Sequence, residues 1–378
     1  MKSDIERIIY KPWSSKVLSD CIDAYRKGQV PVLNLELSAK CSFCSCLYCD
    51  SKVSKAHPQE LSAQETVSLI QELYQSYGLK WIYICGLGEP TEDPKLLKIL
   101  ECSRLLGIEV SMFTNGMGIE HKEIPKLSKY PLNIALKLDS FNEVIFETLL
   151  GRRGAAAKIY SFLNTLLESG FVKVKHRQTN LSLSIVPTKS NRFDIDEIVK
   201  FCKAKKIFPA IGEMETSNKA KINYASLALN RKQLVSLKSR VSDIIGYEYE
   251  RPLCPGIVPS LHITNKGDCV VDDQTGLSCG WFFMKEPRFK LLGSIRHDPL
   301  KEIIKSMHAY RQEKKYLTEG LLKQHNPVFG GGGSQPRKWY RLYFSSLNEY
   351  LKSCQRKGDF YGHERKGVLR NISVRGTF

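Results

Sequence analysis

The densest chemical signal in this sequence is a group of four cysteines within nine residues, at Cys41, Cys44, Cys46 and Cys49. Thiolates are soft ligands that suit iron–sulfur clusters and zinc. Because the group directly follows the apolar stretch Val32–Leu37, we expect it on a loop at the end of a strand. Two Cys-x2-Cys pairs match tetrahedral zinc, but the single residue between the pairs makes it hard for all four thiolates to surround one ion. The spacing alone leaves a cluster and zinc open.

A glycine-rich turn follows the next apolar run, Trp81–Cys85, and consists of Gly86, Leu87, Gly88, Glu89 and Pro90. Glycines at a strand end allow the backbone to approach a ligand closely. The adjacent carboxylate can accept hydrogen bonds from an ammonium group. The same turn also suits an ordinary connection between a strand and a helix. Its position after the cysteines favours a ligand-binding role.

Polar residues end the later apolar runs. Two such groups are Thr114, Asn115 and Gly116, and Lys137, Asp139 and Ser140. Such side chains line a site or cap the next helix, and we expect site lining. Further groups at Pro187–Asn191 and at Gly212, Glu213 and Glu215 would place amide and carboxylate groups around a bound ligand. The two glutamates, spaced to share one strand face, also fit a solvated pair.

These groups require a repeating scaffold. Apolar runs predict six strands, at Val32–Leu37, Trp81–Cys85, Ile108–Phe113, Asn133–Leu138, Leu181–Val186 and Phe208–Ile211. Helical spacing predicts intervening helices at Ala63–Tyr77, Pro94–Leu106, Phe141–Leu150, Ala155–Ser169 and Phe193–Lys205. This alternation predicts right-handed crossovers and a parallel sheet that closes partly into a barrel. The expected fold is α/β, a partial (βα)6 barrel with its chemistry at the carboxyl ends of the strands.

The chain resembles the radical S-adenosylmethionine superfamily. In that family three cysteines after the first strand hold a 4Fe-4S cluster, whose open iron binds the amino and carboxylate groups of S-adenosylmethionine. Cys46-Leu47-Tyr48-Cys49 fits the second half of the family motif, including the aromatic residue. Cys41 lies one residue further from Cys46 than is usual. The resemblance implies Cys41, Cys46 and Cys49 as cluster ligands, with Cys44 as a spare thiol.

The resemblance also implies a binding site for S-adenosylmethionine. Its expected members are Tyr48, Gly86, Gly88, Glu89, Pro90, Thr114, Asn115, Lys137 and Asp139. Leu87 stands where the family usually has a second consecutive glycine, in the turn that binds the amino group. The implied activity is reductive cleavage of S-adenosylmethionine to a radical that removes hydrogen from an unactivated carbon. No catalytic residue on the substrate side can be assigned.

A third group of cysteines, Cys254, Cys269 and Cys279, lies beyond a boundary expected near residues 247–252. A strand, turn and strand are expected over residues 261–272. This region resembles the SPASM or Twitch extensions of radical enzymes, which implies one auxiliary iron–sulfur cluster. Its fourth ligand is left open among His262, Asp272 and the substrate. The alternative is a β-hairpin domain in which the cysteines are simply buried.

The last segment begins with a flexible spacer, Gly330–Ser334, which also looks like an engineered linker. Basic and aromatic residues follow at Arg337–Phe344. This tail fits an accessory docking segment, single-stranded nucleic acid binding, or a fused substrate-like peptide. The expected organisation is a barrel over residues 1–246, a small C-terminal auxiliary-cluster α+β domain over residues 247–329, and a linker with a basic tail over residues 330–378.

The amino-acid composition indicates which classes of partner and which cellular compartment to expect. The 378 residues carry a net charge of +18, which attracts acidic partners such as nucleic acid or an acidic peptide. Neither a signal peptide nor a membrane segment is evident, so we expect a cytoplasmic protein without a membrane partner. In that setting, the twelve cysteines argue against a disulfide framework. The isolated Cys21, Cys85, Cys102 and Cys202 are expected to be buried.

We expect a peptide substrate and a flavodoxin- or ferredoxin-type electron donor. The alternatives are radical modification of RNA or another acidic substrate, and a non-catalytic zinc-binding module.

Overall fold

The computed structural model describes residues 7–42, 45–49, 58–214, 218–250, 260–272 and 289–313. Several predictions therefore fall outside the described residues. These are the predictions for Cys44, Cys254, Cys279, Glu215 and the tail 330–378. The side chains of Cys85 and Asp272 are also outside the described set.

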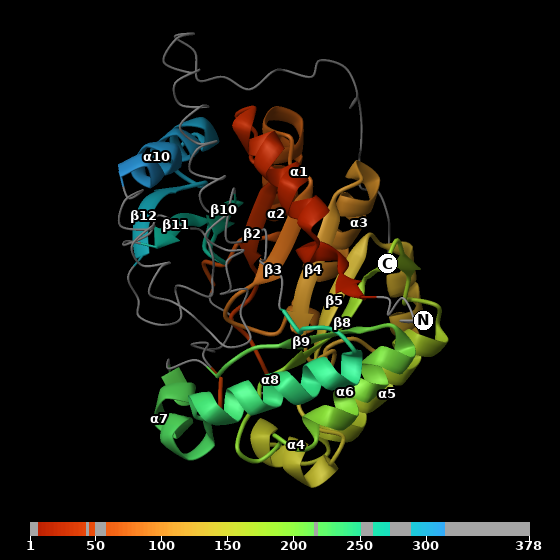
Figure 1. Ribbon diagram of the computed structural model, residues 1–378. Helices are drawn as coiled ribbons and strands as arrows, with labels where there is room; N and C mark the ends of the chain where they lie inside the picture. Colours follow the sequence, from red (N-terminus) through yellow and green to blue (C-terminus); the bar gives the residue numbers. More distant parts are fainter. Residues whose placement is uncertain are drawn as a thin grey trace.

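Six parallel strands form the centre of the molecule, in the order of the chain (Figure 1). They are β2 (Val32–Glu36), β3 (Trp81–Cys85), β4 (Glu109–Thr114), β5 (Leu132–Lys137), β8 (Leu181–Ile185) and β9 (Phe208–Ile211). Each hydrogen-bonds to the next in parallel register. The predicted partial (βα)6 barrel is confirmed, with strand ends within one residue of those expected.

Helices connect these strands as the apolar spacing predicted. They are α2 (Ala63–Tyr77), α3 (Leu96–Leu106), α4 (Glu143–Leu150), α5 (Ala155–Glu168) and α6 (Ile195–Lys205). Local signals fix their ends. Ser62 and Glu65 form a capping box at the start of α2, and Gly78 ends that helix in the left-handed conformation.

Three further strands extend the same sheet beyond β2. Strand β10 (Ser260–Ile263) pairs with β2 in parallel, and β11 (Asp268–Asp272) and β12 (Phe289–Ser294) follow in antiparallel register. Helix α10 (Leu300–Glu313) lies over this part of the sheet (Figure 1). The expected strand, turn and strand over residues 261–272 is confirmed, and it continues the barrel sheet.

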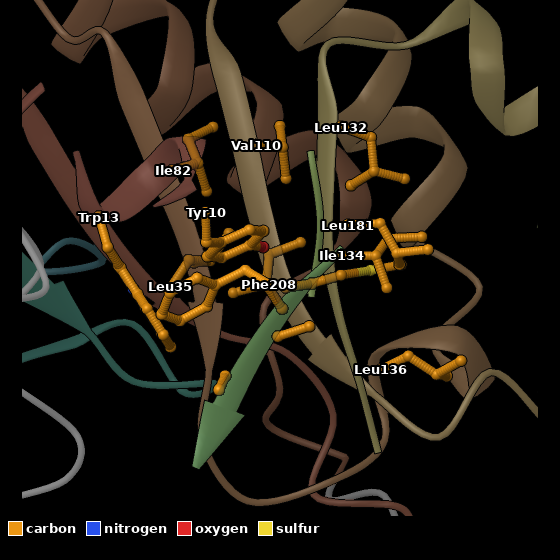
Figure 2. Close-up of a cluster of buried hydrophobic side chains, with 14 of the residues drawn as sticks. Tyr10, Trp13, Leu35, Ile82, Val110, Leu132, Ile134, Leu136, Leu181 and Phe208 are labelled. Atoms are coloured by element: carbon orange, nitrogen blue, oxygen red, sulfur yellow. The ribbon is translucent and has the colours of Figure 1, made fainter. Parts of the chain in front are cut away.

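The segment before the barrel packs against the sheet and was not predicted. It comprises β1 (Ile9–Tyr10), the 3-10 turn η1 (Lys11–Trp13) and α1 (Ser15–Arg26). The Tyr10 hydroxyl lies 3.1 Å from that of Ser111, and the Tyr83 hydroxyl donates to the Pro12 carbonyl at 2.8 Å. Figure 2 shows Tyr10 and Trp13 beside Phe208 in this buried cluster. The segment therefore fills space on one face of the strands.

Smaller elements complete the fold. Strand β1 joins β7 (Gln178–Thr179) and β6 (Val174–Lys175) in a three-stranded sheet. Two 3-10 helices, η2 (Pro90–Glu92) and η3 (His121–Lys129), lie in the loops after β3 and β4. Helices α7 (Asn218–Leu227) and α8 (Arg231–Ile245) follow β9. In the described part of the chain, no helix combines the length and apolar character needed to cross a membrane.

Candidate functional site

The cysteine loop, residues 37–49, leaves the carboxyl end of β2 and is held at two points. The Leu47 N–H donates to the Leu149 carbonyl at 2.9 Å, and the Ser45 hydroxyl donates to the Leu150 carbonyl at 3.1 Å, both at the end of α4. From α7, the Asn223 side chain donates to the Leu47 carbonyl at 2.8 Å. These contacts fix the stretch that carries Cys46 and Cys49.

The glycine-rich turn after β3 packs directly on the cysteine loop. The Glu89 N–H donates to the Lys40 carbonyl at 2.9 Å. A β-carbon at Gly88 would lie 2.8 Å from the Ala39 carbonyl carbon, so no larger residue fits there. At Gly86, where φ is +118°, a β-carbon would lie 2.7 Å from the Glu36 Cγ. The glycines thus make room for the chain's own backbone and for Glu36, in addition to any ligand approach.

The Glu89 carboxylate is buried and joins the ends of β3 and β4. One of its oxygens accepts hydrogen bonds from the Thr114 hydroxyl, from the Thr91 hydroxyl at 2.6 Å and from the Thr91 N–H at 3.0 Å. The other oxygen accepts from the Asn115 N–H at 2.9 Å. Burial raises the pKa of Glu89, and these hydrogen bonds oppose that rise. Of the expected site, Glu89, Pro90, Thr114 and Asn115 therefore lie together, and Pro90 is buried at the start of η2.

A second buried carboxylate, Asp139, joins the cysteine loop to β5 and β8. The Tyr48 hydroxyl donates to it, and its two oxygens lie 3.0 Å and 2.9 Å from the Lys137 ammonium. The Val186 N–H also donates to Asp139 at 2.7 Å. The Lys137 ammonium lies 4.2 Å from the centroid of the Tyr48 ring, within cation–π range. Burial raises the pKa of Tyr48 well above its usual value, so its hydroxyl remains a donor.

The loops after β5 and β8 are tied to each other. The Asn191 side chain donates to the Asp139 carbonyl at 2.9 Å. The Ser140 hydroxyl donates to the Asp194 carboxylate at 2.5 Å and accepts from the Asn142 N–H at 2.8 Å. Asp139 thus contacts the cysteine loop through Tyr48, whereas Ser140 stabilises the turn before α4. Glu213 follows β9 at the same end of the barrel and is half-buried.

Three of the predicted cluster ligands, Cys41, Cys46 and Cys49, are half-buried thiols on one loop. Burial raises the pKa of Cys46 to about 12; the Lys137 charge opposes this, and Cys49 and Asp139 add to it. A thiolate in this position therefore needs a cation close by, which iron provides. In the ranges that the structure describes, no three Cys, His, Asp or Glu side chains converge closely enough to hold one ion. The donor chemistry fits a cluster, and the ligand assignment stays a prediction.

The predicted auxiliary ligand Cys269 lies on β11 and is fully buried. It pairs with Ile263 and shares an apolar cluster with Ile303 and Met307 of α10, and burial raises its pKa to about 12. His262, a candidate fourth ligand, lies one residue from Ile263 and so points to the opposite face of the sheet. Its Nε2 lies 3.1 Å from the Glu36 carboxylate. Because Cys254 and Cys279 are outside the described residues, the auxiliary site stays a prediction.

Sequence reasoning missed the acidic residues that position the cysteine loop. Asp93 accepts from the Ser38 N–H at 2.7 Å, and Glu60 accepts from the Ala39 N–H at 3.1 Å. The Glu60 carboxylate also accepts from the Asn265 side chain at 3.1 Å, which joins the loop to the extension. Single acidic residues in loops form no motif, so the sequence offered no signal for them. The isolated Cys21, Cys102 and Cys202 are buried as predicted.

These strands and loops lie in a region that matches a radical SAM domain. Residues 35–202 match the model of the Radical SAM superfamily, which places both the cysteine loop and the Asn191 loop inside the domain.

Two curated relatives match this region. The chain is 27% identical over 181 residues to the mycofactocin maturase MftC of Mycolicibacterium smegmatis, a match covering 47% of this chain and 43% of that protein. It is 25% identical over 187 residues to an S-adenosylmethionine-dependent nucleotide dehydratase of Flammeovirga pacifica, covering 47% of this chain and 61% of that protein. The matches thus span less than two thirds of either relative.

A solved structure resembles more of the chain. This structure, of anSMEcpe with bound AdoMet and the Cp18Cys peptide, matches with a TM-score of 0.56 at 15% identity. The match covers 86% of this chain and 98% of that one. At this identity the likeness establishes a shared fold over most of the chain.

Proposed function

We propose that this protein is a radical SAM enzyme that reductively cleaves S-adenosylmethionine and removes hydrogen from a peptide substrate. One observation supports the proposed cleavage of S-adenosylmethionine. The radical SAM domain presents a buried carboxylate, Glu89, one strand away from a loop with Cys41, Cys46 and Cys49. The peptide is supported by the fold shared along most of the chain with a structure that holds both AdoMet and a peptide.

The residues suggest a division of roles. Cys41, Cys46 and Cys49 would hold a 4Fe-4S cluster, which supplies one-electron reduction of S-adenosylmethionine when bound. Glu89, held by Thr91 and Asn115, would accept hydrogen bonds from the cosubstrate's ammonium group. Its burial makes a cationic partner favourable, because an isolated charge there would be costly.

Lys137, Asp139 and Tyr48 would form another side of the proposed site. The Lys137 ammonium has three N–H donors, and Asp139 engages only part of that capacity, so the remainder can bind a carboxylate or ribose hydroxyl. The Tyr48 ring lies between Cys46 and Cys49 in sequence and covers one side of the loop. Its burial would keep water from the cosubstrate.

Further components are part of the same proposal. An auxiliary iron–sulfur cluster on Cys254, Cys269 and Cys279 would accept an electron from the product or bind the substrate. A flavodoxin- or ferredoxin-type protein would supply the electron for cleavage. A reducing cytoplasmic compartment would suit such clusters.

The test is anaerobic reconstitution with iron and sulfide, followed by reduction with dithionite in the presence of S-adenosylmethionine. We expect 5′-deoxyadenosine from the wild type and loss of at least 100-fold, on the order of 3 kcal/mol, in Cys46→Ala. Cys102→Ala, which removes a cysteine from α3, is the matched control and should retain activity. Equal rates in wild type and Cys46→Ala would overturn the ligand assignment. A colourless protein that binds zinc would instead indicate a zinc-binding module.

A second candidate is modification of a nucleotide or of RNA. The net charge of +18 and the match to a nucleotide dehydratase favour it. Binding of RNA would weaken steeply with salt, because each neutralised phosphate releases counterions. Measuring the affinity for a 20-nucleotide RNA at NaCl concentrations between 50 and 200 mM distinguishes an RNA substrate from a peptide substrate. Loss of affinity by about 10³-fold or more would support nucleic acid, and absence of binding at low salt would exclude RNA.

A further inference from the structure

An exposed aromatic residue lies between two arginines at the start of α6. The Phe193 side chain is 68% exposed. The Arg192 guanidinium carbon lies 4.7 Å from its ring centroid, and that of Arg240, on α8, lies 5.9 Å away. We call these three residues the Phe193 cluster. Aromatic residues and arginine are the types most enriched at the centres of protein interfaces.

The two arginines differ in how their charges are satisfied. The Arg240 Nε lies 3.0 Å and 3.2 Å from the two oxygens of Asp196, and its Nη2 donates to the Arg192 carbonyl at 2.8 Å. In the described part of the chain, the buried Nε of Arg192 has no hydrogen-bond partner, and Arg192 forms no ion pair. Because the protein encloses this Nε, an external acceptor would meet the terminal N–H groups of the half-buried Arg192 side chain instead.

The Phe193 cluster is joined to the candidate site through its own loop. Asn191, immediately before Arg192, donates to the Asp139 carbonyl at 2.9 Å. Asp194, immediately after Phe193, accepts from the Ser140 hydroxyl at 2.5 Å. Helix α8, which supplies Arg240, packs along α6 (Figure 1). The cluster therefore lies beside the carboxyl ends of β5 and β8, next to the proposed reaction site.

We propose that the Phe193 cluster binds an acidic segment of the peptide substrate outside its reacting residue. This inference rests on the proposed function and adds the recognition chemistry. A carboxylate matches the planar fork of a guanidinium and can accept from the terminal N–H groups of Arg192, which takes part in none of the ion pairs of the described residues. A stacked nucleobase fits less well, because Arg192 already contacts the Phe193 ring. The net charge of +18 favours an acidic partner at longer range.

The test measures binding to the full chain, reconstituted anaerobically, by fluorescence anisotropy. The probes are a fluorescein-labelled peptide of aspartate, glutamate and glycine, the same peptide with lysine in place of the acids, and a 20-nucleotide RNA. The variants are Arg192→Glu, Arg192→Gln and Phe193→Ala. Lys158→Glu, an exposed position on α5, is the charge-matched control. Dithionite-driven cleavage of S-adenosylmethionine is scored in parallel.

We expect Arg192→Glu to weaken acidic-peptide binding about tenfold, Arg192→Gln and Phe193→Ala several-fold, and Lys158→Glu less than twofold. Cleavage of S-adenosylmethionine should stay unchanged in all four. Equal weakening by Arg192→Glu and Lys158→Glu would overturn the proposal, because the affinity for the acidic peptide would then depend only on the net charge of the protein. Absence of acidic-peptide binding, or loss of RNA binding alone, would also overturn it. Failure of the wild type to cleave S-adenosylmethionine would instead count against the proposed function.

Discussion

Gly88 lies against the carbonyl of Ser38, so a β-carbon on Gly88 would overlap that oxygen. The contact joins the glycine-rich turn to the start of the cysteine loop. Two motifs that the sequence presents as separate ligand-binding features are therefore one packed unit. The position of the cysteine loop depends on the absence of a side chain at Gly88 in the neighbouring turn.

Gly88→Ala should displace the cysteine loop. Overpacking of this kind costs about 1–3 kcal/mol, and here the displaced atoms are backbone rather than a flexible side chain. We expect lower iron incorporation and a lower free energy of unfolding. Gly107→Ala is the control, because a β-carbon there meets nothing within 4 Å and only the left-handed φ of +69° is strained. Iron content and urea denaturation of both variants measure the difference; equal iron loading in both would contradict the packing argument.

Cys44→Ala should retain the amino-terminal cluster, whereas Cys41→Ala should lose it. The prediction follows from the assignment of Cys41, Cys46 and Cys49 as the three ligands, which leaves one iron open for the cosubstrate. Iron and sulfide analysis with electron paramagnetic resonance of the reduced protein checks it. Loss of the cluster in Cys44→Ala with retention in Cys41→Ala would exchange the two assignments.

Glu89→Gln should abolish binding of S-adenosylmethionine and alter the pH dependence of stability. Burial raises the pKa of Glu89 in the folded state, so the folded protein holds this proton more tightly than the unfolded chain. The resulting stability is present below the unfolded carboxyl pKa and is lost as the pH rises through the folded pKa. Glutamine cannot titrate. The free energy of unfolding of the wild type should therefore fall relative to that of the variant as the pH rises through the folded pKa of Glu89. Urea denaturation from pH 4 to 8 measures this difference; parallel profiles would contradict the burial of a titrating carboxyl.

His308 should make the protein sensitive to acid. It is buried on α10 with its Nδ1 2.6 Å from the Tyr25 hydroxyl, and burial, with the Arg311 charge, lowers its pKa to about 3. Below the unfolded histidine pKa, the unfolded chain takes up a proton that the folded chain does not. The free energy of unfolding should then fall by up to about 1.4 kcal/mol per pH unit as the pH falls toward 3.

His308→Asn should remove that slope while leaving other acid-sensitive groups unchanged. Comparison of the two proteins by urea denaturation between pH 7.5 and 5 isolates the histidine, because cluster loss affects both. An identical pH dependence in the wild type and the variant would show that His308 does not titrate in this way.

The barrel could be predicted because each strand is an apolar run and each helix has its own period and caps. The short β6 and β7 could not, since two-residue strands exist only through pairing. Tyr10 and Trp13 gave no local signal either, because their contacts lie about 100 residues away, as in the hydrogen bond of Tyr10 to Ser111.

The candidate site likewise contains residue pairs that could be predicted from the sequence and pairs that could not. Glu89 with Thr114, and Lys137 with Asp139, follow from strand order, because neighbouring parallel strands end at one edge. The pair of Glu36 and His262 depends on β10 returning to β2 after 226 residues, which no local pattern encodes. The contact of Arg240 with the Phe193 ring likewise depends on α8, a helix that the apolar pattern did not indicate.

Strand β10 occupies the side of β2 opposite β3. A chain cut after residue 250 would leave the backbone groups of Val32–Leu35 on that side without their present partners, as a bare sheet border. The cysteine loop would then follow an edge strand of the sheet. Without the carboxyl-terminal strands, β2 would thus need other residues or another partner to protect its exposed edge.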